Sequence, residues 1–192
     1  PDMIIVKCKS TAHDWGVYHS SLGSGKTLYL NTTGASTSAT GWQSTDPTST
    51  VFSIDNAANS LNQSGQSFVF YAFASKKGYS KFGSYTGNGN ADGTFVYTGF
   101  RPAWLMVKRT DSSNAWIIHD NKRSPSNVVK LNLNANTSNA ENTNDGFFDF
   151  LSNGFKCRST DGGVNTSGGT YIYAAFAENP FVTSSGIPTT AR

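Results

Sequence analysis

Residues 23–27 read Gly-Ser-Gly-Lys-Thr and have the residue types of a nucleotide-binding loop. Such a loop has a further glycine five positions before its Gly-Lys-Thr, and it is followed by a helix whose N-terminal amides hold phosphates. Here Ser20 stands at the glycine position, and the residues after Lys26 alternate and include β-branched and aromatic types, as in a strand. The stretch therefore predicts a Gly/Ser hairpin loop that enters a strand, not an NTPase.

The acidic residues do not form the pair that glycoside hydrolysis needs. That reaction requires two carboxylates flanking the scissile bond. The chain has just two glutamates, Glu141 and Glu178, and no Glu-x-Asp or Glu-x-x-x-Glu spacing. Asp145 and Asp149 would share one face of a strand, but Asp149 lies between two phenylalanines and fits an outward strand position. Since a Gly-x-Ser-x-Gly elbow is also missing, the sequence predicts no catalytic residue and a protein that is not an enzyme.

The histidines and cysteines do not have the spacing of a metal site. They are His13, His19, His119, Cys8 and Cys157, with no Cys-x-x-Cys and no paired histidines. For the cysteines we favour two buried thiols, and one disulfide between them is the open alternative.

Two stretches have the composition of calcium loops. Residues 88–93 read Asn-Gly-Asn-Ala-Asp-Gly, and the second stretch contains Asp120, but both lack regular alternation and a closing glutamate. Because Asn, Asp and Gly often form turns without an ion, we expect no metal and no cofactor.

Composition limits the classes of fold and partner. The chain has 192 residues, of which 14% are charged and 13% aromatic, with a net charge of +3. A polar, uncharged surface over an aromatic and β-branched core suits a β-sandwich or barrel. Short basic clusters at residues 7–9 and 122–123 do not make the basic stripe that is expected of a nucleic-acid binder. No apolar run approaches the roughly 18 residues of a membrane span. We expect neither nucleic acid nor membrane insertion.

An internal repeat is the strongest pattern in the chain. Residues 1–7 align with residues 102–108 at an offset of 101, and residues 52–74 align without a gap with residues 155–177 at an offset of 103. Two matched ends with a small change between them indicate two copies of one module of roughly 100 residues.

The first offset also pairs Trp15 with Trp116 and Leu30 with Leu131. Both tryptophans alternate with aliphatic residues, so we favour core positions for them. Turn-forming clusters separate the apolar runs and indicate an antiparallel sandwich. The strands expected in the second copy cover residues 94–98, 104–108, 115–119, 128–133, 147–151, 154–157 and 170–177.

The predicted fold is all-β, with two tandem antiparallel β-sandwich modules of jelly-roll type related by the repeat. Residues 1–83 form the first module and residues 84–181 the second. Residues 84–101 have no counterpart before Pro1, so we expect the chain to start partway through a module. Residues 182–192 lack a core-forming pattern and are expected to be a surface tail.

Four stretches carry a resemblance to a known family. They are YTGNGNADGTFVYTGFRPAWLMVKRTDSSNAWIIHDNKR, FLSNGF, GGTYIYAAFAENPF and SSGIPTTAR. They resemble a module of virion structural proteins from marine bacteriophages, of tail-fibre or tail-associated type, whose modules are placed near concanavalin A-like lectin folds. The resemblance covers the second copy and the tail, and reaches the first copy only through the repeat. It implies a location on the virion surface.

Glycan contact is the binding chemistry that the composition favours. Aromatic rings at a sandwich edge can stack on sugar faces while Asn and Asp side chains hydrogen-bond hydroxyls. We expect the glycan-binding candidates to be exposed. They are His119, Asp120, Asn121, Trp42, Tyr85 and His19.

These expectations combine into one functional hypothesis. The chain is a phage virion protein of tail-fibre or surface-decoration type that mediates adhesion to host-surface glycans. Its partners are host glycans, other virion proteins and, by analogy with fibres, further copies of itself, since linked weak sites gain avidity. Two alternatives are a secreted glycan-cleaving enzyme of concanavalin A-like fold and a structural lattice protein without a ligand.

Overall fold

The computed structural model describes residues 1–38, 41–55, 59–143 and 146–180. Within these residues the chain forms three antiparallel β-sheets and one short helix, α1 (Asn59–Asn62). The prediction of an all-β, antiparallel sandwich fold is therefore confirmed.

We name the sheets I, II and III. Sheet I has the order β4-β3-β2-β1-β5 and contains β1 (Met3–Cys8), β2 (Gly16–His19), β3 (Lys26–Tyr29), β4 (Thr37–Ser38) and β5 (Phe68–Phe73). Sheet II has the order β10-β9-β8-β13-β6 and contains β6 (Ser80–Thr86), β8 (Pro102–Arg109), β9 (Trp116–Asp120), β10 (Asn132–Asn134) and β13 (Thr170–Ala177). Sheet III has the order β11-β12-β7 and contains β7 (Phe95–Tyr97), β11 (Phe148–Leu151) and β12 (Gly154–Cys157).

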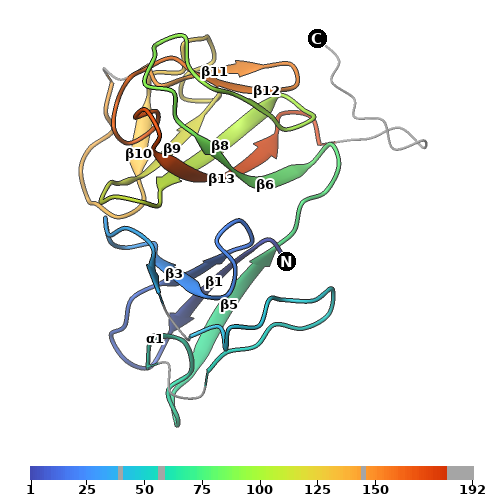
Figure 1. The fold of residues 1–192 in the computed structure, drawn as a ribbon, viewed down its shortest axis with the longest axis vertical. Coiled ribbons are helices and arrows are strands. Elements are labelled where there is room, and N and C mark those ends of the chain that lie inside the picture. Colours follow the sequence, from blue (N-terminus) through green and yellow to red (C-terminus); the bar gives the residue numbers. More distant parts are fainter. Residues whose placement is uncertain (39–40, 56–58, 144–145, 181–192) are drawn as a thin grey trace.

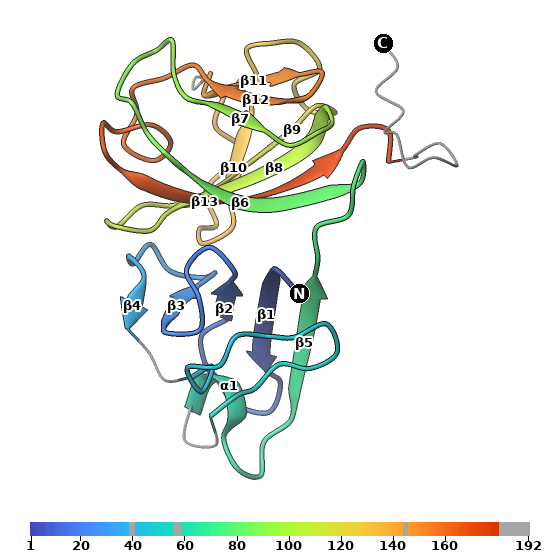
Figure 2. The same cartoon turned by 45° about the vertical axis from the view of Figure 1, so that its right-hand side comes forward.

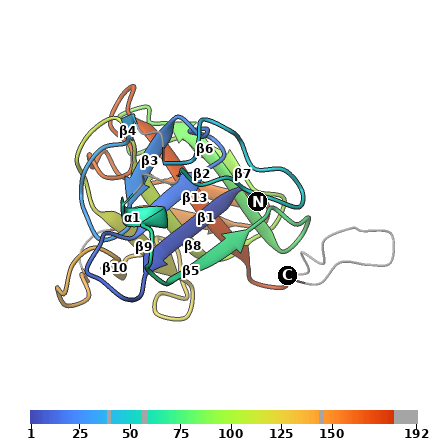
Figure 3. The same ribbon diagram turned by 90° about the horizontal axis from the view of Figure 1, so that it is seen from below.

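The sheets are stacked as three layers, with sheet II in the middle. Figures 1 and 2 show sheet III above sheet II and sheet I below it, and Figure 3 shows sheet I in front of sheet II. Along β8, Leu105 and Val107 pack toward sheet III, whereas Trp104 and Met106 pack toward sheet I. Successive side chains point to opposite faces of a strand, so a strand in a middle layer needs apolar residues throughout. This explains the unbroken apolar run in β8.

Two buried clusters fill the spaces between the layers. The cluster between sheets II and III is rich in aromatic rings, and Phe155 packs edge-to-face on both Phe148 and Tyr173. The cluster between sheets I and II joins the two halves of the chain in one core. It consists of Met3, Val17, Leu28, Phe82, Met106, Trp116, Ile172 and Ala174.

The outer face of sheet I is covered by the segment that connects β4 to β5. Trp42 and Leu61 from this segment pack on Ile4, Val6 and Tyr18 of sheet I. The first half of the chain therefore supplies a single sheet between two different coverings, not a two-sheet sandwich of its own.

The predicted domain limits differ from the structure for the same reason. The limit between residues 1–83 and 84–181 falls inside β6, which begins at Ser80 and pairs with β13 over seven residues. Because the core between sheets I and II is shared, the halves are not independent sandwiches. The predicted tail, residues 182–192, lies outside the described residues.

Sheets I and II nevertheless share a four-stranded arrangement. The order β3-β2-β1-β5 corresponds to β10-β9-β8-β13. Met3 pairs with Phe73, and Trp104 pairs with Phe176, so the two registers differ by the offsets 101 and 103 seen in the sequence. The duplication of the module itself stays a prediction.

The correspondence shifts at the next strand. Val17 pairs with Leu28 in sheet I, and Ile118 pairs with Leu133 in sheet II. Leu28 therefore corresponds to Leu133, and the alignment of Leu30 with Leu131 is wrong. The connection before β10 is longer than the one before β3, which a gapless alignment cannot accommodate.

The Gly-Ser-Gly-Lys-Thr stretch leads directly into the strand β3, as predicted, and not into a helix. Lys26 is the first residue of β3, and its Nζ donates to the Ser38 hydroxyl at 3.1 Å.

Candidate functional site

The two histidines among the predicted site residues are buried in the cores. His119 lies between sheets II and III with its ring edge-on to Phe147 and Phe148, and His19 lies between sheets I and II. The His19 Nε2–H donates to the Tyr173 carbonyl at 3.2 Å. Burial lowers the pKa of each ring to about 4. The expectation that these rings are exposed is wrong, because their strand positions face a neighbouring layer.

Three further predicted residues are also buried, and each donates a side-chain hydrogen bond within the fold. The Trp42 Nε1–H donates to a threonine hydroxyl of β3 at 3.0 Å, and the Tyr85 hydroxyl donates to the Val164 carbonyl at 2.7 Å. The Asn121 side-chain amide donates to Glu178 at 2.9 Å. Their expected exposure is therefore wrong as well, and their polar atoms hold loops and edges in place.

Asp120 is the one predicted residue that keeps partial exposure. Its carboxylate lies 2.5 Å from Arg123 Nε, and Arg123 also contacts Glu141 at 2.9 Å. Burial raises the pKa of Asp120, but hydrogen bonds from the Arg123 backbone and side chain outweigh this and lower it. Residues 119–121 lie at the end of β9, whereas Tyr85 lies on β6 at the edge of the same sheet, and His19 and Trp42 belong to sheet I and its covering segment. The six therefore do not form one site.

Trp116 is buried between sheets I and II, as predicted, whereas Trp15 is only half-buried. The Trp116 Nε1–H donates to the Tyr29 carbonyl at 2.9 Å. The Lys7 ammonium lies over the Trp15 ring, 5.7 Å from its centroid.

Cys8 and Cys157 are free and buried, which confirms the preference for two buried thiols. Burial raises the pKa of Cys157 to about 12. Burial also raises the pKa of Cys8, but hydrogen bonding to Thr11 and Ser10 outweighs it and brings the value to about 7.

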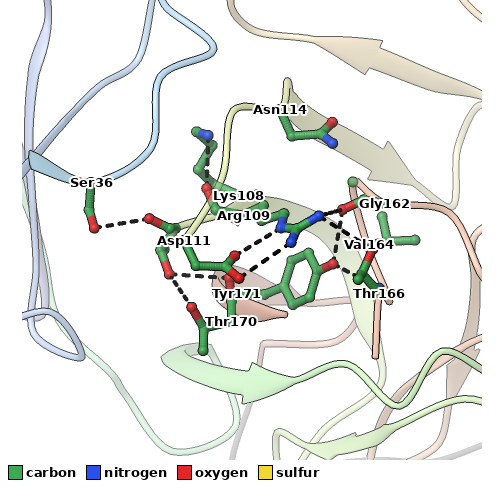
Figure 4. A network of polar contacts seen from close by, with 12 residues as sticks. Ser36, Lys108, Arg109, Asp111, Asn114, Gly162, Val164, Thr166, Thr170 and Tyr171 are labelled. Carbon is green, nitrogen blue, oxygen red and sulfur yellow. Dashed lines mark hydrogen bonds and ion pairs between the residues drawn. The ribbon is translucent and has the colours of Figure 1, made fainter. Parts of the chain in front are cut away.

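A polar network on Arg109 fixes a long loop to sheet II. Figure 4 shows the Arg109 guanidinium between the Asp111 carboxylate and the Gly162 carbonyl, at 2.8 Å and 3.3 Å. The Tyr171 hydroxyl donates to the same carbonyl at 2.9 Å and accepts the Thr166 N–H at 2.9 Å. Arg109, Asp111, Gly162, Thr166 and Tyr171 bond to one another, so this network is a structural clamp.

Hydrogen bonds next to this clamp connect the two halves of the chain. The Lys108 ammonium is buried and donates to the Thr33 carbonyl at 3.1 Å and to the Arg109 carbonyl at 2.8 Å. Ser36 donates to the Thr110 carbonyl at 3.0 Å. Burial lowers the pKa of Lys108 to about 8, helped by the Arg109 charge.

A cleft of about 580 Å³ opens where the chain passes from sheet I to sheet II. It is lined by the β5–β6 turn, the start of β6, the end of β7 and the β11–β12 turn. Lys76, Lys77 and Lys81 line one side, and Tyr97 lies on the other. We call this the lysine cleft.

The lysine side of the cleft is a closed turn. Lys76 and Ser80 exchange two backbone hydrogen bonds of 3.0 Å, and Gly78 has a φ of 71°, in the left-handed region that glycine adopts without strain. The Ser80 hydroxyl donates to the Ala74 carbonyl at 2.7 Å and fastens the turn to the end of β5. The lysines are therefore carried on an ordered backbone.

The opposite side is held by backbone bonds within sheet III. The amides of Thr98 and Gly99 both donate to the Asn153 carbonyl, at 3.0 and 3.1 Å. This pairs the β7 end with the β11–β12 turn and leaves Tyr97 65% exposed at the rim. An aromatic ring is thus fixed facing solvent at the cleft.

The charge of the lysine cleft is not neutralised within the described part of the chain. Lys76, Lys77 and Lys81 are exposed, and none has an ion pair or side-chain hydrogen bond with another described residue. No acidic residue from the described ranges lines the cleft. Three like charges in a concave site concentrate positive potential and attract anions. The cleft can therefore bind carboxylate, sulfate or phosphate groups beside an aromatic ring.

Sequence reasoning missed this cluster. Residues 75–81 read Ser-Lys-Lys-Gly-Tyr-Ser-Lys and are the densest lysine stretch in the chain. The Lys-Lys-Gly sequence indicates a basic turn, but the other wall of the cleft, from residues 97–99 and 152–153, is formed only by the tertiary fold.

Two other site types receive no support from the described residues. The described residues contain no group of three His, Cys, Asp or Glu side chains that could hold a metal ion. The helix found among the described residues is too short to cross a membrane.

The fold and the cleft define a class: a three-layered antiparallel β protein with a basic, aromatic-rimmed cleft. The chain belongs to the family described as "Domain of unknown function (DUF7483)", whose model matches residues 1–180. The match spans all three sheets, so the family unit includes both halves of the chain. No curated protein and no solved structure matches.

Proposed function

We propose that this chain is a non-catalytic adhesion module of a phage virion surface, of tail-fibre or decoration type, that binds acidic glycans of the host. The observation that carries the glycan part is the lysine cleft, which is lined by an exposed tyrosine and by three lysines that have no ion pair with another described residue. The virion location rests on the sequence resemblance. The layered β fold agrees with such a role but does not by itself specify it.

Each part of the cleft has a distinct role in this proposal. Tyr97 stacks on the apolar face of a sugar ring, while Lys76, Lys77 and Lys81 attract its carboxylate, sulfate or phosphate groups. The volume of about 580 Å³ is in the range of small-ligand sites. Exposed ammonium groups bind weakly and are screened by salt. Strong attachment therefore requires many copies on one particle.

The carboxylates favour binding over glycan hydrolysis. A general acid in a glycosidase needs a raised pKa. Asp120 and Glu141 contact Arg123, and Asp149 contacts Arg158. Among described carboxylates with a displaced pKa, each is displaced downward. Glycan cleavage is therefore the alternative outcome of the oligosaccharide titration described next.

Titration of the protein with defined oligosaccharides tests the proposal. The probes are a uronic-acid oligosaccharide, a sulfated oligosaccharide and a neutral glucan of equal length. We expect binding of the acidic probes only, weakening as salt is raised. The triple variant Lys76→Gln, Lys77→Gln, Lys81→Gln should lose about tenfold or more in affinity, and Tyr97→Ala should weaken binding in the same direction.

A matched control removes the same charge elsewhere. Lys9, Lys122 and Lys130 are exposed and do not line the cleft, so their triple change to Gln should leave affinity within about twofold. Equal losses in both triples would show general charge attraction and contradict a cleft site. Release of new reducing ends from a probe would replace the adhesion proposal with the enzyme alternative.

A further inference from the structure

Strand β5 is a free edge of sheet I. It pairs with β1 on one side, and no other strand follows it in the sheet order. No backbone hydrogen bond joins its outer edge to another described residue. The Phe52 ring contacts Phe70 at 5.1 Å between centroids, but only through the side chains. The backbone groups along this edge are thus open to a further strand.

The corresponding edge in sheet II is occupied. β13 holds the position in sheet II that β5 holds in sheet I, and β6 pairs with β13 from Thr170 to Phe176. Figure 2 shows β6 beside β13, and β5 at the edge of its sheet. The structure itself therefore contains an example of how this edge is covered.

The side chains of β5 are more exposed than their counterparts on β13. Phe70 corresponds to Tyr173 through the shared register; Phe70 is 56% exposed and Tyr173 is 4% exposed. Tyr71 corresponds to Ala174, and their exposed fractions are 49% and 3%. An apolar edge with this much exposed aromatic surface is a typical strand-pairing site.

Glycine at one position explains how β6 fits its neighbour. Gly83 lies opposite Tyr173, and a Cβ on Gly83 would lie 2.8 Å from the tyrosine hydroxyl oxygen and 3.0 Å from the ring. The absence of a side chain leaves room for the ring to lie across the strand. Gly83 corresponds to the position opposite Phe70 in a strand that pairs with β5 in the same register.

Charge also distinguishes β5, the edge strand of sheet I, from β6, an edge strand of sheet II. The outer edge strand β6 exposes Lys81, and its aromatic residues Phe82 and Tyr85 are buried. Lysines on edge strands discourage pairing with other chains. Residues 68–74 contain no charged residue at all.

We propose that the β5 edge binds an antiparallel strand of the β6 type, donated by another polypeptide of this family. The strand carries glycine opposite Phe70 and an aromatic residue opposite Tyr71, as β6 does opposite β13. Main-chain hydrogen bonds hold it, and the glycine specifies the register. This interface links modules and is independent of the lysine cleft.

A peptide with the sequence of residues 79–87, Tyr-Ser-Lys-Phe-Gly-Ser-Tyr-Thr-Gly, is the probe. It is titrated into isotope-labelled full chain, and amide shifts and hydrogen exchange are followed by NMR. We expect shifts confined to β5 and its neighbours, and exchange of β5 amides slowed about tenfold at saturation. A peptide with Gly83→Val should bind at least about fivefold more weakly, although valine favours strands.

Two protein variants separate edge pairing from general stickiness. Tyr71→Lys places a charge on the exposed β5 edge and should abolish peptide binding. Leu133→Lys makes the same change at another exposed apolar position, on the β10 edge of sheet II, and should leave binding unchanged.

Three results would overturn the proposal. The first is the absence of peptide-induced shifts in β5. The second is a set of shifts along β13, which would mean that the peptide exchanges with β6. The third is a dimer of the full chain that Tyr71→Lys abolishes, because the occupant would then be a second β5 strand.

Discussion

Acidification should destabilise this protein through His119. The ring lies between sheets II and III, and neither nitrogen has a hydrogen-bond partner of ordinary geometry among the residues that the structure describes. Burial lowers its pKa from 6.5 to about 4, with a small opposing effect from the Leu131 backbone. A base with a depressed pKa contributes its full stability above pH 6.5, and that stability is lost as the pH falls toward 4.

The magnitude follows from proton linkage. At pH 5 the unfolded chain is largely protonated at this histidine and the folded protein is not, which costs about 2 kcal/mol of unfolding free energy. His19 has a pKa of about 4 for the same reason, burial, so the pair costs about 4 kcal/mol. A domain has about 5–15 kcal/mol in total, so the loss is large.

Urea unfolding followed by tryptophan fluorescence at pH 7.5 and 5.0 measures this loss. The variant His119→Phe keeps a ring against Phe147 and Phe148 but cannot ionise. Wild type should lose about 4 kcal/mol between the two pH values and the variant about 2 kcal/mol. At pH 7.5 the variant should be as stable as wild type or more so, because two unpaired polar atoms are removed.

The variant His119→Gln is the control for packing. It also cannot ionise but keeps a buried polar group, so it should be less stable at both pH values with the same reduced pH dependence. The reasoning is refuted if His119→Phe loses as much stability as wild type between pH 7.5 and 5.0.

Two further substitutions, one of them with a matched control, test the contact between β12 and β7 within sheet III and the clamp on sheet II by the same urea assay. A Cβ on Gly154 would lie 2.1 Å from the Val96 carbonyl oxygen, so Gly154→Ala should cost about 1–3 kcal/mol or more. Gly25 has no atom within 4 Å of its added Cβ, so Gly25→Ala should stay within about 0.5 kcal/mol, and equal effects would contradict the contact argument. Tyr171→Phe removes the buried hydroxyl of the clamp and should cost about 1–3 kcal/mol; no measurable cost would mean that the clamp is not stabilising.

The strands of the second half are largely predictable from local pattern. The apolar run at 104–108 predicts a central strand, and the structure places it in β8, buried on both faces. The expected strands at 154–157 and 170–177 coincide with β12 and β13. The strand expected at 128–133 is found only at 132–134, because the preceding residues connect to β11 by a single bridge at Val129.

Strand β6 escaped the sequence prediction, and the domain limit was misplaced as a result. Residues 80–86 contain a lysine and a glycine and show little apolar pattern. Gly83 accommodates the Tyr173 ring, which is a property of the neighbouring strand and not of β6 itself. Local propensity cannot reveal such a fit.

The predicted exposure of the candidate site residues is wrong for a related reason. The sequence predicts exposed side chains at His119 and Trp42, but a third layer covers His119 and a connecting segment carries Trp42 into a buried cluster. The lysine cleft combines residues 75–81 with residues 97–99 and 152–153, which are distant in the chain. Its lysines were visible in the sequence, but their tyrosine partner across the cleft was not.

Alternating side chains and turn residues were sufficient to establish an antiparallel β protein, because both are encoded over a few neighbouring residues. They could not say which surface covers each face of a sheet. Met3 and Met106 are 103 positions apart in the chain and lie in one buried cluster, and that cluster joins what looks in the sequence like two separate modules into one three-layered core. Burial depends on such long-range contacts, so the assignment of exposed and buried residues had to come from the folded protein.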